Sequence, residues 1–164
     1  MITTLNRDQL AQKFISYLDA TDEQRTQQVE EGHAKEYKEH GHIRVARKHP
    51  YMWGTVEHRH NGGTGCVFVS CNGHGEVLTS ATIQHAIDPE LQCMNLYYED
   101  GCGVYEEDCD AHIIAAYFPE RAEKMGFNYG GECSTREGAV RSTVTYYEEE
   151  VRTLLERVEG RSLA

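Results

Sequence analysis

The spacing of apolar residues changes twice along this chain, and those changes limit the folds open to it. Near the N-terminus, apolar residues from Leu10 to Leu18 fall on one face of a helix. Between about 42 and 79, β-branched and aromatic runs are interrupted by glycine, which is typical of short strands and turns. A helical stripe returns from about 135 to 158. This order predicts an α+β domain, in which a small antiparallel sheet of three to five strands has N-terminal and C-terminal helices packed on it.

The same patterns set expected element bounds. We expect two N-terminal helices, separated by a capping box that begins at Thr21, and glycine-bounded strands after residue 42. The expected helices span 4–20, 22–39, 80–87, 107–117, 120–125 and 135–158, and the expected strands lie within 43–46, 51–60, 65–70, 76–79 and 91–98. As domains, we expect a helical arm over 1–41 and an α+β domain over 42–164, with its motif-bearing core at about 51–122.

The formal net charge of −11 is carried by one part of the chain. Residues 1–50 hold eight Lys/Arg and eight Asp/Glu, whereas residues 51–164 hold eight Lys/Arg and nineteen Asp/Glu. Nucleic-acid affinity depends on Lys and Arg neutralising phosphates, so direct nucleic-acid binding by the acidic part is disfavoured. An acidic face suits a basic partner surface or a divalent cation.

Several function classes lack their sequence signals. No apolar run approaches the about 20 residues that span a bilayer, and the N-terminus has no signal-peptide order, so we expect a cytoplasmic protein and no membrane partner. The six cysteines lie at irregular spacings without a CxxC pair, which favours reduced thiols. The sequence contains no GxxxxGK[ST], GxSxG or HExxH motif.

The densest polar cluster is the run Glu106-Glu107-Asp108-Cys109-Asp110. In the first turn of a helix over 107–117, each carboxylate would be stabilised by roughly 0.3–1 kcal/mol by the helix dipole. That role accounts for two or three acids and does not require four. In such a helix Asp108 and His112 would share one face, as a metal site or an acid–base pair requires.

His74 is the second candidate, because it stands between Gly73 and Gly75 after an apolar strand. It is either a turn histidine bonded to a nearby carbonyl or a functional group that shares a polar pocket with the acidic run. The candidate metal ligands are His74, Asp108, His112 and Cys109, for a divalent ion such as zinc or manganese. The candidate catalytic residues are His74, Glu106, Glu107 and Asp108.

Two His-x-His pairs, His40/His42 and His58/His60, are a weaker metal signal. On a strand such a pair projects to one side and can share an ion.

Four short motifs occur in a recognisable order: Trp53-Gly54, Val69-Ser70 followed by His74-Gly75, Tyr105 to Asp110, and Phe118-Pro119-Glu120. In this the chain resembles a domain of unknown function encoded by phages, plasmids and other bacterial mobile elements. That domain carries a WG, a VSTxxHGG, a WYEEDCDW and an FPE. The match covers about 51–122 and departs at Glu76, Val104 and Ala111, where the domain has Gly, Trp and Trp. The resemblance implies a bacterial host cytoplasm as the setting.

Two functional hypotheses follow. The first is a small acidic accessory protein that binds and inhibits or modulates a host protein or protein–nucleic-acid complex, such as a nucleic-acid-handling defence complex. Its candidate binding residues are Trp53, Glu99, Asp100, Glu106, Glu107 and Asp110. The alternative is a metal-dependent hydrolase or nuclease-like enzyme that uses His74 and the Glu106–His112 segment. A third, purely structural reading has His74 tie the hairpin to the acidic segment. The 22–39 helix and the final helix are candidate homodimer surfaces.

Overall fold

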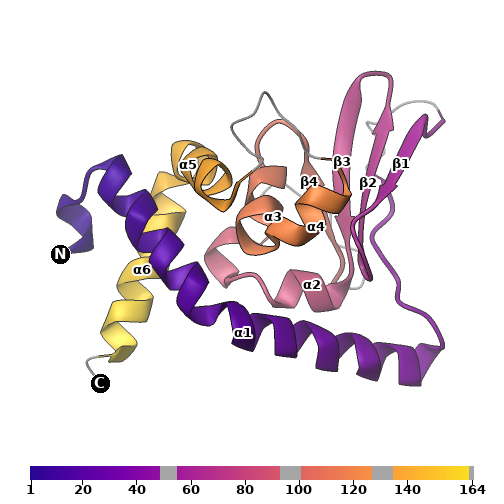
Figure 1. The fold of residues 1–164 in the computed structure, drawn as a ribbon, viewed down its shortest axis with the longest axis horizontal. Helices are drawn as coiled ribbons and strands as arrows, with labels where there is room; N and C mark the ends of the chain where they lie inside the picture. Colours follow the sequence, from indigo (N-terminus) through magenta and orange to yellow (C-terminus); the bar gives the residue numbers. More distant parts are fainter. Residues whose placement is uncertain (49–54, 93–100, 127–134, 163–164) are drawn as a thin grey trace.

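The computed structural model describes residues 1–48, 55–92, 101–126 and 135–162 (Figure 1). Trp53, Glu99, Asp100 and most of the strand expected over 91–98 lie outside the described residues.

The described chain packs helices against a four-stranded sheet, so the α+β prediction is confirmed. The strands are β1 (His58–Asn61), β2 (Cys66–Cys71), β3 (His74–Thr79) and β4 (Gly103–Glu106). The helices are η1 (Ile2–Thr4), α1 (Arg7–His40), α2 (Ala81–His85), η2 (Pro89–Leu91), α3 (Ala111–Tyr117), α4 (Pro119–Lys124), α5 (Arg136–Tyr146) and α6 (Glu148–Ser162). None of the helices in these described segments is long and apolar enough to cross a bilayer.

The sheet is antiparallel throughout, in the order β1-β2-β3-β4. A two-residue turn joins β2 to β3, and both of its residues, Asn72 (φ 50°) and Gly73 (φ 78°), adopt the positive φ that such hairpin turns require. The sequence pattern did not predict β4, which is only four residues long and begins at a glycine.

The two faces of the sheet are buried in separate clusters. Cys66, Val77 and Tyr105 face the main core, which they share with α1, α3, α5 and α6. Val67 and Val104 lie on the opposite face in a smaller cluster. The alternation along each strand explains this division, because successive side chains point to opposite faces.

The N-terminal helix is one 34-residue element, so the break predicted between 4–20 and 22–39 is wrong. The Thr21 hydroxyl donates to the Tyr17 carbonyl at 2.8 Å, as it does inside a continuing helix, and does not cap a new one. α1 runs along the other helices and extends beneath α2 toward the sheet (Figure 1). Its first half lies in the main core, with Leu10 and Leu18 fully buried.

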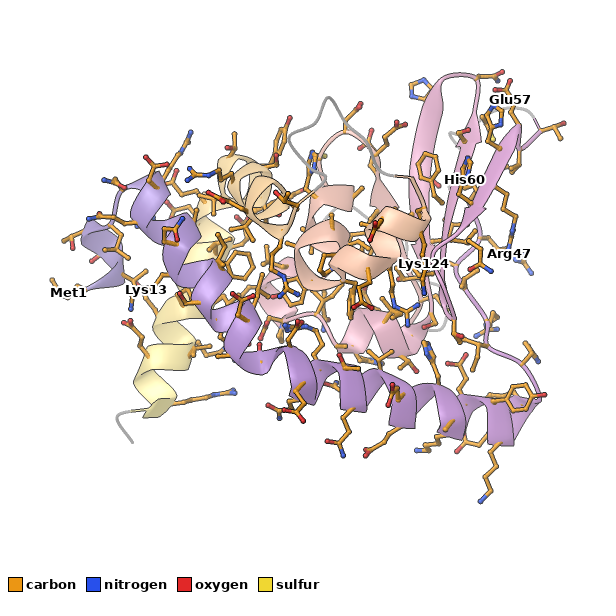
Figure 2. The ribbon with its side chains drawn as sticks, viewed as in Figure 1. Met1, Lys13, Arg47, Glu57, His60 and Lys124 are labelled. Atoms are coloured by element: carbon orange, nitrogen blue, oxygen red, sulfur yellow. The ribbon has the colours of Figure 1, made fainter. Side chains whose placement is uncertain are left out.

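The C-terminal stripe forms two helices where one was expected. α5 ends at Tyr146 and α6 begins at Glu148, because Tyr147 leaves the helical region (φ −132°, ψ 45°). The bend lets α6 turn back along α1, where Glu159 forms an ion pair with Lys13 (Figure 2). The N-terminal helix α1 and the C-terminal helix α6 therefore lie against each other.

Candidate functional site

The acidic segment lies in the turn between β4 and α3. The helix expected over 107–117 begins only at Ala111, and its first turn contains no acidic residue. Glu106, Glu107 and Asp108 therefore precede the helix, and Asp110 stands at its N-cap position without a side-chain capping hydrogen bond. The helix starts late because the preceding residues are still paired with the sheet. Glu106 is in register with Glu76 of β3, and the Glu107 amide donates to the Gly75 carbonyl at 2.9 Å. The chain thus follows the sheet through residue 107.

The structure places His74 beside this turn. His74 is the first residue of β3, and the β2–β3 hairpin ends next to the β4–α3 turn. Residues 73–75 and 106–108 line one surface hollow of about 10 Å³, which has room for about one water molecule. His74 and Asp108 are exposed, while Glu106 and Glu107 are half-buried.

Gly75 determines how closely the hairpin and the turn approach. A Cβ atom at this position would lie 2.5 Å from Cζ of Phe68 and would meet the carboxylate of Glu107. Gly75 is one of the motif glycines of the domain that the chain was expected to resemble, and the packing gives a steric reason for it. Glu76, which replaces the second glycine of that domain's motif, is fully buried.

Asp110 belongs to the interior, although it was a candidate for partner binding. Its carboxylate is fully buried and accepts a hydrogen bond from the Tyr147 hydroxyl. The Cys109 thiol also donates to it, at 3.4 Å. Asp110 therefore joins the start of α3 to the α5–α6 bend and offers no carboxylate to a partner's surface. The sequence could not distinguish it from the neighbouring acids.

The Cys109 thiol is half-buried and stays protonated at neutral pH. Burial, with the negative charge of Asp110 as the next cause, raises the pKa of this thiol to about 12. Nucleophilic attack needs the thiolate, so Cys109 is poorly suited to that role.

His112 lies in the interior beside α5. Its ring stacks on Tyr146 with centroids 6.0 Å apart, and burial lowers its pKa, although a hydrogen bond to the backbone of Asp108 acts in the opposite sense. Because Asp108 precedes α3, the two side chains do not share a helix face as predicted.

The described histidines and acids were expected to include a set of metal ligands. Among the described residues, no three His, Cys, Asp or Glu side chains are arranged to hold a metal ion. His58 and His60 do project to one side of the outer strand β1, with ring centroids 6.4 Å apart. They form a two-imidazole pair on an exposed strand. Figure 2 labels His60 on this strand.

Sequence reasoning missed a larger hollow of about 290 Å³ on the helical side. Residues 117–121, at the α3–α4 junction, form one wall, and Asp22, Thr26, Val29 and Glu30 of α1 form the other. The signal in the sequence is the Phe118-Pro119-Glu120 motif, which lies at the α3–α4 junction.

Comparison with known proteins adds one finding. Searches of curated proteins and of solved structures give no match. A family model described as "Domain of unknown function (DUF7007)" matches residues 46–163, beyond the 51–122 region that the four motifs indicated. This match covers most of the chain, and the protein therefore belongs to the DUF7007 family of domains of unknown function.

Proposed function

We propose that this protein binds a basic surface of a host macromolecule through the acidic turn, defined as Glu106, Glu107 and Asp108, together with the adjacent hairpin tip at His74. The observation that carries this proposal is the shape of the site. Three carboxylates surround a hollow of about 10 Å³, which is far smaller than the roughly 300–1,000 Å³ of small-molecule sites. A site of this kind contacts another surface and does not enclose a substrate.

The charge of the chain supports the same function. With a net charge of −11, the protein is attracted to basic surfaces before contact, which raises association rates. Complexes that handle nucleic acids expose grooves of Lys and Arg for phosphates. An acidic protein that occupies such a groove would inhibit the complex. We propose this role in a bacterial cytoplasm, as an accessory protein of a phage or plasmid.

The test compares two variants that change the net charge equally. E106Q/E107Q/D108N neutralises the acidic turn, whereas E123Q/E149Q/E156Q neutralises three exposed acids on α4 and α6. Each is used as bait in bacterial lysate, and the affinity for the recovered partner is measured at two salt concentrations. We expect the acidic-turn variant to bind at least about tenfold more weakly than wild type, while the control keeps its affinity.

Equal affinities for the two triple variants would contradict the proposal, because the net charge alone would then account for binding. Failure of wild-type protein to retain any partner in bacterial lysates would contradict it as well.

The metal-dependent hydrolase is the second candidate, favoured by one observation: His74 shares its hollow with three carboxylates, as an acid–base pair requires. We rank it second because the hollow does not enclose a substrate. Elemental analysis of purified protein separates the two functions. Stoichiometric zinc or manganese that is lost in His74→Ala would reverse the ranking.

A further inference from the structure

The 290 Å³ hollow between α1 and the α3–α4 junction has an apolar base. Val29 and Tyr117 are buried there, and Phe118 and Pro119 are half-buried around them. The volume lies near the lower end of small-ligand pockets and suits one long side chain. An aliphatic stem laid across Phe118 and Pro119 would be removed from water.

The charges at the rim are mostly negative. Asp22, Glu30 and Glu120 line the hollow. The Asp22 carboxylate is already paired within the chain, because Arg136 donates a hydrogen bond to it at 2.8 Å. Glu30 and Glu120 are exposed, and within the described segments neither forms an ion pair.

Among the described residues that line the hollow, the one cation, Arg121, is directed elsewhere. The Arg121 guanidinium donates to the carbonyls of Gly62 and Thr64, at 3.4 and 2.5 Å, in the β1–β2 turn. It therefore anchors the hairpin. The charge of Glu120 also acts on Arg121, but within the described segments Arg121 forms no ion pair with Glu30 or Glu120.

The same wall already accepts a guanidinium from within the chain. Arg25 of α1 lies over the Tyr117 ring, with its Cζ atom 5.1 Å from the ring centroid. Stacking of this kind is favourable because the face of an aromatic ring is negative. The aromatic residues of the α3–α4 junction are thus compatible with a planar cation.

We propose that this hollow binds an arginine side chain of a partner protein, with its stem on Phe118 and Pro119 and its guanidinium between Glu30 and Glu120. Arginine fits better than lysine because its planar head can engage carboxylates with paired hydrogen bonds and stack on a ring. This site is separate from the acidic turn, and its test involves neither that turn nor an unidentified partner.

The experiment is an NMR titration of the full-length, ¹⁵N-labelled protein. The probe is Nα-acetyl-arginine amide, and the matched control is Nα-acetyl-citrulline amide, which has nearly the same shape without the charge. The binding variant is E30Q/E120Q. The control variant, E31Q/E123Q, makes the same charge change one and three positions away on the same two helices.

With the arginine probe, we expect saturable shifts of the amides of 117–121 and of α1 around Val29. The citrulline probe and E30Q/E120Q should each show at least about fivefold weaker binding, and E31Q/E123Q should match wild type. Equal binding of the two probes, an equal effect of the two double variants, or no shift at these residues in folded protein would overturn the proposal. Any of these results would leave the function of the acidic turn unaffected.

Discussion

At the residue scale, Gly75 allows the hairpin and the acidic turn to meet. A Cβ atom there would lie 2.5 Å from the Phe68 ring, so we expect Gly75→Ala to lower the free energy of unfolding by about 1–3 kcal/mol. The control is Gly160→Ala in α6, where an added Cβ atom would contact none of the other described residues within 4 Å outside the backbone of its own helix. Alanine favours the helix there, by up to about 1 kcal/mol. Urea denaturation measures both. A Gly75→Ala protein as stable as wild type would show that the hairpin and the acidic turn are not in close contact at Gly75.

The Tyr147 hydroxyl is the second residue-scale determinant, because it donates to the buried carboxylate of Asp110. We expect Tyr147→Phe to cost about 1–3 kcal/mol, since that carboxylate loses one of its donors inside the protein. Tyr146→Phe is the matched control, because the neighbouring Tyr146 is 56% exposed and its stacking on His112 needs only the ring. Thermal or urea unfolding should give a lower free energy of unfolding for Tyr147→Phe than for Tyr146→Phe. Equal free energies for the two variants would count against a structural role for Asp110.

The candidate residues also show how far sequence reasoning reaches at this scale. Composition and spacing singled out His74 and the acidic run, and the structure places both at one hollow. The same reasoning could not separate exposed Asp108 from buried Asp110, because both are Asp residues in one short run and only the position of Tyr147 in space decides. A donor 37 residues away leaves no local pattern.

At the element scale, Arg136 joins three helices. Its guanidinium donates to the carboxylates of Asp19 and Asp22 on α1, both at 2.8 Å, and to the Ala116 carbonyl on α3 at 2.9 Å. The same contact with Arg136 is the main cause that lowers the pKa of Asp22. Arg136 is largely buried, whereas both carboxylates are about half exposed, so solvent weakens the pairing.

We therefore expect Arg136→Gln to lower the free energy of unfolding by about 1–3 kcal/mol. The control is Arg141→Gln on the same helix, whose partners Asp8 and Glu137 are exposed and whose loss should have little effect. Chemical denaturation with both variants provides the test. Similar losses for the two would mean that the Arg136 cluster does not hold α1 in place.

The elements themselves were predictable to different degrees. The sequence patterns predicted helices at both ends of the chain, the glycine-bounded hairpins and the N-cap of α2 at Ser80. The Ser80 hydroxyl accepts a hydrogen bond from the Ile83 amide at 3.1 Å. The patterns did not predict the unbroken α1, because a Thr that caps a helix and a Thr inside one have the same local sequence. They also missed the bend at Tyr147, since the apolar stripe continues through it.

At the scale of the whole molecule, His33 attaches the second half of α1 to the sheet side. Its ring lies 2.8 Å from the Ser80 hydroxyl and packs against Gly65. Burial is the main cause that lowers the pKa of His33, with the charge of Arg121 adding to it and that of Glu36 opposing it. The folded protein therefore binds this proton less readily than the unfolded chain.

Because the pKa of His33 is lower in the folded protein than in the unfolded chain, the contribution of neutral His33 to stability should be fully present above the unfolded-state pKa of about 6.5. This contribution should fall as the pH drops below that value. We expect a lower free energy of unfolding at pH 6.0 than at pH 8.0, and a smaller decrease in His33→Gln. Part of the decrease should remain in that variant, because burial also lowers the pKa of His112. His42→Gln, at an exposed position, should behave as wild type. Equal free energies of unfolding at the two pH values would contradict a lowered pKa of His33 in the folded protein.

We propose that the hairpin tip and the acidic turn form one binding surface on an α+β framework. Amide hydrogen exchange on the complex with a partner captured by the wild-type protein tests this most directly. We expect slowed exchange to appear together at residues 72–76 and 104–109, relative to the free protein. Protection confined to α6 or to the β1 edge, with unchanged exchange in both of those segments, would contradict it.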